Sequence, residues 1–124
     1  MNTVFSNGPT APANTPTNER ELELLRLVVA RDRAAFKELY LIYHRRLARF
    51  LMRMTAHHEL IEEIINDTLW TVWQKAGDFR GASRVSTWIV GIAYRRALKT
   101  LRQSHVRTMI ADDGHTQIPD LPLH

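Results

Sequence analysis

The sequence predicts an all-α fold, a compact bundle of about four helices with disordered N- and C-terminal tails. Three observations lead to this prediction. Apolar side chains recur at steps of three and four residues in four successive stretches. No stretch shows the alternating apolar and polar pattern of a β-strand, and no internal repeat is present. A chain of 124 residues is long enough to bury one such core but short for two domains.

The first helix is expected from about residue 19 to residue 30. Residues 1–18 carry no charged side chain and are rich in Asn, Thr, Pro and Ala, so we interpret them as a disordered leader. Asn18 is a candidate N-cap, and Glu21 three residues later would complete a capping box. The apolar positions that follow at helical spacing are Leu22, Leu25, Val28 and Val29.

The second and third helices carry the longest periodic patterns. Asp32 is a candidate N-cap of the second helix, which is expected to run for about six turns. Its apolar positions are Phe36, Leu39, Tyr40, Tyr43, Leu47, Phe50, Leu51 and Met54. The apolar positions of the third helix are Ile61, Ile64, Ile65, Leu69, Val72, Trp73 and Ala76. Gly77 then suits a left-handed C-terminal cap.

The fourth helix is expected after a loop over residues 77–86, with Ser86 as its N-cap. Its buried side would consist of Ile89, Ala93, Ala97 and Leu101. The pattern fades near residues 103–105. Residues 108–124 contain glycine, two prolines and three aspartates, so we interpret them as a linker or tail after a helical domain over residues 19–107.

The absence of cysteine and of a long apolar run bears on the cellular compartment in which the protein is expected. Cysteine is absent, which excludes disulfides, thiolate metal sites and cysteine catalysis. The longest apolar run, residues 88–94, is far below the roughly 20 residues that span a bilayer. We therefore expect a cytoplasmic protein without membrane insertion.

Charge is segregated along the chain, although the net charge is only +4. Residues 45–53 carry four arginines and no acid, residues 54–73 carry four acids and no Lys or Arg, and residues 91–107 sum to +5. An acidic helix and a basic helix in one small domain indicate two different partners, because a single partner rarely suits both signs.

The third helix gathers polar and acidic side chains around one tryptophan. On a helical wheel these side chains occupy one arc opposite the apolar positions. Together with Glu59, the arc comprises Glu62, Glu63, Asn66, Asp67, Trp70 and Gln74. Two interpretations remain open: a solvated helix face with an incidental tryptophan, or a protein-docking face with Trp70 as its anchor.

The fourth helix aligns Trp88, Arg95, Lys99 and Arg102 on one face, with Gly91 leaving space between them. Aromatic rings stack on bases and cations follow the phosphate backbone, so this combination is typical of single-stranded nucleic-acid binding. Arg80 and Arg84 in the preceding loop add to the charge. The alternative is that the tryptophan packs in the core and the cations are merely solvated.

Evidence for catalysis is weak. His58 and Glu62 stand at i and i+4, as in a metallopeptidase helix, but glutamate replaces the second histidine of that motif. Acidic residues near a helix N-terminus are explained by the helix dipole. Nucleophile elbows and glycine-rich phosphate loops are also absent. We therefore expect neither an enzyme nor a metal or cofactor.

Four segments in order resemble a known family. Residues 32–47 resemble its opening helix, residues 62–73 (EEIINDTLWTVW) its most characteristic segment AEDLVQETFLRVW, residues 79–81 (FRG) its loop, and residues 86–95 (STWIVGIAYR) its TWLxxIARN segment. The stretch from Asp32 to Arg102 thus resembles domain 2 of extracytoplasmic-function sigma factors, the promoter-melting module of bacterial RNA polymerase initiation factors.

The resemblance implies a helical domain that melts and recognises the promoter -10 element. In this family the acidic helix docks on the clamp coiled coil of the largest subunit of core RNA polymerase. The loop would capture a flipped base, and the fourth helix would follow the melted non-template strand. The residues placed on DNA by this resemblance and by the charge pattern are Phe79, Arg80, Arg84, Trp88, Arg95, Arg96, Lys99 and Arg102. An anti-sigma protein is a further partner that the resemblance allows.

The sequence departs from the family pattern at several positions. Tyr94 and Arg95 replace the usual Arg-Asn pair, Lys99 replaces a common aspartate, and Asn66 and Asp67 replace a glutamine and a glutamate. No helix-turn-helix domain for the -35 element follows. We interpret the chain as a fragment of a longer factor, the alternative being a divergent stand-alone module. A second functional hypothesis is a sigma-like adaptor or antagonist that acts through protein contacts without binding DNA.

Overall fold

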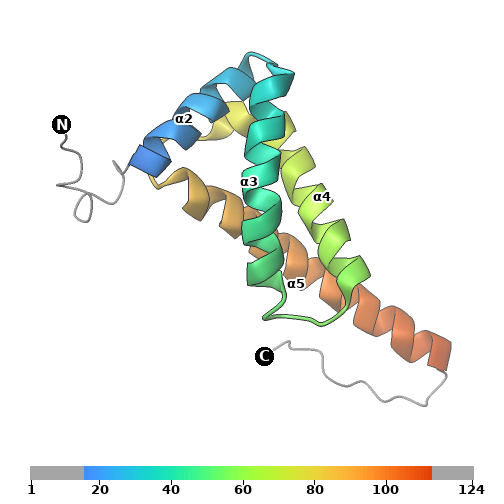
Figure 1. Ribbon diagram of the computed structural model, residues 1–124. Coiled ribbons are helices and arrows are strands. Elements are labelled where there is room, and N and C mark those ends of the chain that lie inside the picture. Colours follow the sequence, from blue (N-terminus) through green and yellow to red (C-terminus); the bar gives the residue numbers. More distant parts are fainter. Residues whose placement is uncertain (1–15, 113–124) are drawn as a thin grey trace.

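The computed structural model describes residues 16–112, and the side chains of residues 17–107. In this range the chain forms α2 (Pro16–Val29), α3 (Arg33–Leu51), α4 (His58–Lys75), the short 3-10 helix η3 (Ala76–Asp78) and α5 (Val85–Asp112), and it contains no strand. The all-α prediction is confirmed. The helices α3 and α4 run antiparallel side by side, while α5 crosses both and extends beyond them at its C-terminal end (Figure 1).

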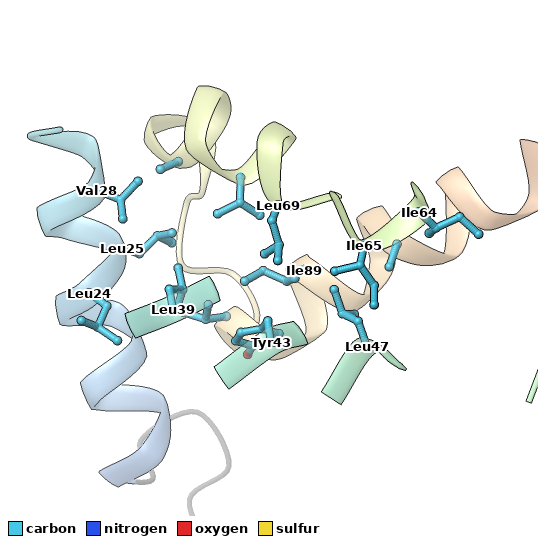
Figure 2. Close-up of a cluster of buried hydrophobic side chains, with 14 of the residues drawn as sticks. Leu24, Leu25, Val28, Leu39, Tyr43, Leu47, Ile64, Ile65, Leu69 and Ile89 are labelled. Carbon is cyan, nitrogen blue, oxygen red and sulfur yellow. The ribbon is translucent and has the colours of Figure 1, made fainter. Parts of the chain in front are cut away.

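All four α-helices contribute to one core, which Figure 2 shows in close-up. Leu25, Leu39, Leu69 and Ile89 represent α2, α3, α4 and α5 respectively, and each is at most 3% exposed. The predicted buried side of the fourth helix is confirmed, because its four members are all fully buried. The core therefore fixes α5 against α4, the pair of helices that carries the predicted binding residues.

The turn between α2 and α3 has defined capping. Arg31 has a positive φ of 68°. The amides of Arg31 and Asp32 donate to the carbonyls of Val28 (2.8 Å) and Leu27 (3.0 Å), which is the Schellman pattern of a helix C-terminus. Asp32 Oδ1 then accepts a hydrogen bond from the Ala35 amide at 3.1 Å. The predicted N-cap of the second helix is therefore confirmed.

The predicted capping box at the start of the first helix is wrong. The helix begins at Pro16, because proline suits the first helical position, where its missing N–H has no intrahelical acceptor. Asn18 lies inside this helix, is 5% exposed, and accepts a hydrogen bond from the Val85 amide at 3.0 Å. It thus caps α5 rather than its own helix. Glu21 is also buried and faces α3 instead of the N-terminus of α2.

Two further capping predictions are wrong. The chain after α4 continues into η3, where the Phe79 amide donates to the Ala76 carbonyl at 3.2 Å, so Gly77 does not take the left-handed conformation. That conformation occurs at Gly81, with φ of 82°. Ser86 lies within the first turn of α5 and is not its N-cap, because the helix already begins at Val85 under the Asn18 side chain.

The fourth helix is longer than predicted. It continues past residues 103–105 to Asp112, since no glycine or proline interrupts the chain before Gly114. Residues 16–18 and 108–112, which the sequence assigned to the tails, are helical. Residues 1–15 and 113–124 lie outside the described part of the chain, so the rest of the predicted tails stays a prediction. No helix within residues 16–112 combines the length and apolar character that crossing a membrane requires.

Candidate nucleic-acid interface and protein-docking face

The helix α4 presents an acidic outer surface. We call the six predicted docking residues on it the acidic face, which comprises Glu62, Glu63, Asn66, Asp67, Trp70 and Gln74. Five of the six are exposed, and Asp67 is half-buried. The Trp70 side chain is 58% exposed, so it does not belong to the core. The structure therefore brings all six onto one surface with a large apolar ring among carboxylates.

One edge of the acidic face is held by α3. Tyr40 donates a hydrogen bond to Asn66 Oδ1 at 3.0 Å, and His44 Nε2 lies 3.0 Å from Glu62 Oε1. The Tyr40 and His44 rings also stack on each other, with 5.8 Å between centroids. Sequence reasoning missed both residues in this role. The spacing of Tyr40 predicts a core position, yet its polar hydroxyl could have indicated the half-buried boundary position that it occupies.

A groove of about 360 Å³ lies between the C-terminal half of α4 and the neighbouring face of α5. We call it the basic groove, and its lining consists of Thr71, Lys75, Asp78, Trp88, Ile92, Arg95, Arg96 and Lys99. Four of these side chains are cations and one is an acid. None of the four cations forms an ion pair with any residue in the described part of the chain. Their charge is therefore not neutralised by an ion pair within this part of the chain.

Trp88 supplies the apolar wall of the basic groove. Its ring is half-buried, and the Phe79 ring packs against it with 5.3 Å between centroids. Phe79 therefore supports the tryptophan from the loop. At Gly91 an added Cβ would stand 3.6 Å from Nη1 of Arg95, an ordinary van der Waals distance, so the glycine is not required to make space for that guanidinium.

The structure separates the other predicted cations from the basic groove. Arg80 and Arg84 are exposed beside the left-handed Gly81. Arg84 lines a different hollow of about 340 Å³, together with Arg46 and the buried Glu21. Arg102 lies further along α5, where it lines a shallow hollow near Val106. Of the eight predicted DNA-binding residues, Trp88, Arg95, Arg96 and Lys99 share the groove. Sequence reasoning missed Lys75, which closes the groove from α4.

A buried polar network fixes the start of α5 relative to α2 and α3. Tyr43 donates a hydrogen bond to Glu21 Oε1 at 2.6 Å, and Arg46 forms an ion pair with Glu21 Oε2 at 3.0 Å. Burial, followed by the hydrogen bond to Glu21, raises the pKa of the Tyr43 phenol well above its usual range. Asn18, one turn before Glu21 on α2, caps α5. The position of the first residue of α5 therefore depends on a contact from α2.

His58 and Glu62 stand four residues apart in the first half of α4. Glu62 contacts His44 of α3. Among the described side chains, no group of three His, Cys, Asp or Glu residues could hold a metal ion.

A comparison with protein families identifies the domain. The model of sigma-70 region 2 matches residues 39–107, more than half of the chain. The chain belongs to the sigma-70 region 2 family. The match covers the acidic face, the loop and the basic groove, whereas α2 lies before it. Asn18 of α2, which caps α5, therefore lies outside the segment that the sigma-70 region 2 model matches.

Two curated relatives of this chain are sigma factors of the extracytoplasmic-function (ECF) type. The chain is 39% identical over 74 residues to the ECF RNA polymerase sigma factor RpoE of Cereibacter sphaeroides, covering 59% of this chain and 41% of that protein. It is 32% identical over 84 residues to the ECF RNA polymerase sigma factor SigM of Mycobacterium tuberculosis H37Rv, covering 68% and 43% respectively. The chain thus spans less than half the length of these relatives. No solved structure matches it.

Proposed function

We propose that this chain acts in bacterial transcription initiation, as a sigma-factor domain that binds core RNA polymerase through the acidic face and the melted promoter -10 strand through the basic groove and its loop. The observation that carries the proposal is the arrangement of two oppositely charged surfaces on the adjoining helices α4 and α5. The domain works by selective binding without covalent chemistry.

The acidic face suits a helical partner rich in arginine, such as the clamp coiled coil of the largest polymerase subunit. Trp70 is exposed at its centre, with Glu63 and Asp67 beside it. Tryptophan is a frequent hot-spot residue, and carboxylates around it favour cationic partners. The hydrogen bonds from Tyr40 and His44 fix Asn66 and Glu62 before binding, which reduces the entropy lost on docking.

The basic groove suits single-stranded DNA. Trp88 offers a ring for stacking, while Lys75, Arg95 and Lys99 supply unpaired positive charge within the same groove. Strand opening is favoured because the groove holds phosphates and unstacked bases that a closed duplex does not offer. The loop residues Arg80 and Arg84, and Arg102 further along α5, lie outside the groove and add exposed positive charge before and after it along the chain.

The first test is a titration of the chain with a purified clamp coiled-coil fragment, in which binding is monitored by tryptophan fluorescence. We expect saturable binding that Asp67→Arg abolishes. Glu19→Arg is the matched control, because it makes the same charge change at an exposed position on α2. Absence of binding by the wild-type chain, with its helical circular dichroism intact, would contradict the docking assignment.

The second test addresses the strand. Arg95→Glu and Lys99→Glu should weaken binding to a single-stranded oligonucleotide and lower the slope of log K against log salt by about 0.7 for each phosphate that the variant no longer neutralises. Lys37→Glu, at an exposed position on α3, is the control. Coiled-coil binding without any DNA binding would favour an adaptor or antagonist that acts through protein contacts alone.

A further inference from the structure

The outer surface of α3 and α4 carries two rows of charge that face away from the core. Arg45 follows the buried Tyr43 by two residues, and Glu63 precedes the buried Ile65 by two. Two residues correspond to about 200° of rotation around a helix, so each charged side chain points away from the core-facing side of its helix. Because α3 and α4 lie side by side over one core (Figure 1), both rows belong to the same outer surface.

Each row contains three charged side chains spaced four residues apart. We name them the arginine row, which consists of Arg45, Arg49 and Arg53, and the acidic row, which consists of Glu59, Glu63 and Asp67. Arg53 lies in the turn after α3, where its amide still donates to the Phe50 carbonyl at 3.2 Å. Five of the six side chains are exposed, and Asp67 is half-buried. None of the six forms an ion pair with a residue in the described range.

One exposed apolar side chain continues each row. Leu41 lies four residues before Arg45 and is 60% exposed, and Trp70 lies three residues after Asp67 and is 58% exposed. Steps of three and four residues keep a side chain on the same face of a helix. The apolar side chain therefore stands at the N-terminal end of the arginine row and at the C-terminal end of the acidic row.

The two rows are complementary when α3 of one chain lies antiparallel to α4 of another. Setting Arg49 opposite Glu63 brings the other charges into register, because both rows advance by four residues. The pairs of opposite charge are then Arg45 with Asp67, Arg49 with Glu63, and Arg53 with Glu59. The same register brings Leu41 close to Trp70. Rows of this spacing are also the ridges that interlock in the commonest class of helix packing.

We propose that this outer surface binds a second copy of the chain, as a two-fold dimer in which the arginine row of each copy contacts the acidic row of the other. Two-fold symmetry repeats every contact, so the three ion pairs and the apolar contact each occur twice. One exposed ion pair contributes little, whereas a network around a tryptophan contributes more. Self-association goes beyond the proposed function. If the acidic face also docks on core RNA polymerase, as proposed above, the dimer covers Trp70 and keeps the chain from that partner.

The test measures self-association of the whole chain by sedimentation velocity at increasing protein concentration. The wild type should form dimers, and raising the salt from about 50 mM to about 500 mM should weaken them, because salt screens exposed charges. Arg49→Glu and Glu63→Arg each place like charges opposite one another, so each should raise the dimer dissociation constant about tenfold or more. Arg80→Glu in the loop and Glu19→Arg on α2 are the matched controls, since they make the same charge changes at exposed positions outside this surface.

A mixture of the two charge-reversed variants tests whether the two rows contact each other. The Arg49→Glu chain is negative at both positions and the Glu63→Arg chain is positive at both, so a mixed dimer has opposite charges at both contacts. The mixture should therefore dimerise with an affinity close to that of the wild type, although neither variant does so alone. Unchanged thermal unfolding of each variant verifies that its fold is intact.

Three results would overturn the inference and leave the polymerase and DNA assignments in place. The first is a wild-type chain that stays monomeric at low salt up to its solubility limit. The second is self-association that the charge reversals change no more than their controls do. The third is a mixture of the two variants that fails to dimerise.

Discussion

The acidic face and the basic groove are adjacent, yet they are built differently. The acidic face belongs to one helix, and α3 supports its edge through Tyr40 and His44. The basic groove exists only where α5 packs against the end of α4, and its cations have no ion-pair partner among residues 17–107. In the proposed function, a preformed docking face therefore lies beside a positively charged groove whose partner supplies the negative charge.

The largest expected effect comes from a substitution in the core, which would disrupt the acidic face and the basic groove together. Ile89 is fully buried on α5 and contributes to the core that holds the helices around the groove. Ile89→Ala should lower the free energy of unfolding by about 2–5 kcal/mol, because apolar burial decreases and a cavity remains. Urea denaturation measures this change. A decrease below about 1 kcal/mol would show that α5 does not depend on this packing.

A selective effect is expected from Trp70→Ala. Because Trp70 is 58% exposed, the free energy of unfolding should change by no more than about 0.5 kcal/mol. In the proposed docking Trp70 is the anchor, so its removal should weaken coiled-coil binding by about 2 kcal/mol or more, roughly 30-fold. Leu41→Ala, at an α3 position that is 60% exposed, is the control for removal of an exposed apolar side chain. Similar decreases in binding by the two variants would contradict the anchor role.

The polar contacts between α2 and α3 predict a pH dependence of the stability. Tyr43→Phe removes one donor to the buried Glu21 and should cost about 1–3 kcal/mol at neutral pH. The raised pKa of Tyr43 means that its contribution is complete below its unfolded pKa of about 10 and is lost as the pH rises above it. Above pH 10 the wild type should therefore lose up to about 1.4 kcal/mol per pH unit more than the variant. Parallel stability curves from pH 9 to 11 would contradict this prediction.

The smallest expected effect concerns the cap of α5. Asn18→Ala should destabilise the protein by about 0.5–2 kcal/mol, because the Val85 amide loses its acceptor. Asn18→Asp keeps an acceptor at the helix N-terminus and should recover most of this stability. Thermal unfolding of both variants tests the prediction. Failure of aspartate to restore stability would show that other contacts of Asn18 are more important than the cap.

The sequence predicted what depends on helical periodicity. The buried side of α5 and the exposed position of Trp70 both follow from spacing within one helix, and both are confirmed. Features that depend on tertiary contacts were not predictable in this way. Asn18 caps a helix that begins 67 residues later. Lys75 completes the groove only because the end of α4 faces α5.

Local capping signals were ambiguous for a related reason. Gly77 was the predicted left-handed cap, but it lies within the single turn of η3, and Gly81 adopts the left-handed conformation instead. Ser86 is a good N-cap residue, but Asn18 already supplies the acceptor one residue earlier. Such choices depend on which acceptor the tertiary structure places near each backbone amide. The spacing of residues along the chain does not specify this.

The most direct test of the central claim measures single-strand binding with the acidic face already occupied. The chain is saturated with the clamp coiled-coil fragment, and a labelled oligonucleotide is then titrated by fluorescence anisotropy. Separate surfaces predict a ternary complex, with DNA affinity equal to or higher than that of the free chain. Displacement of the coiled coil by DNA, or DNA affinity that falls as the fragment binds, would contradict an account in which α4 and α5 hold two different partners.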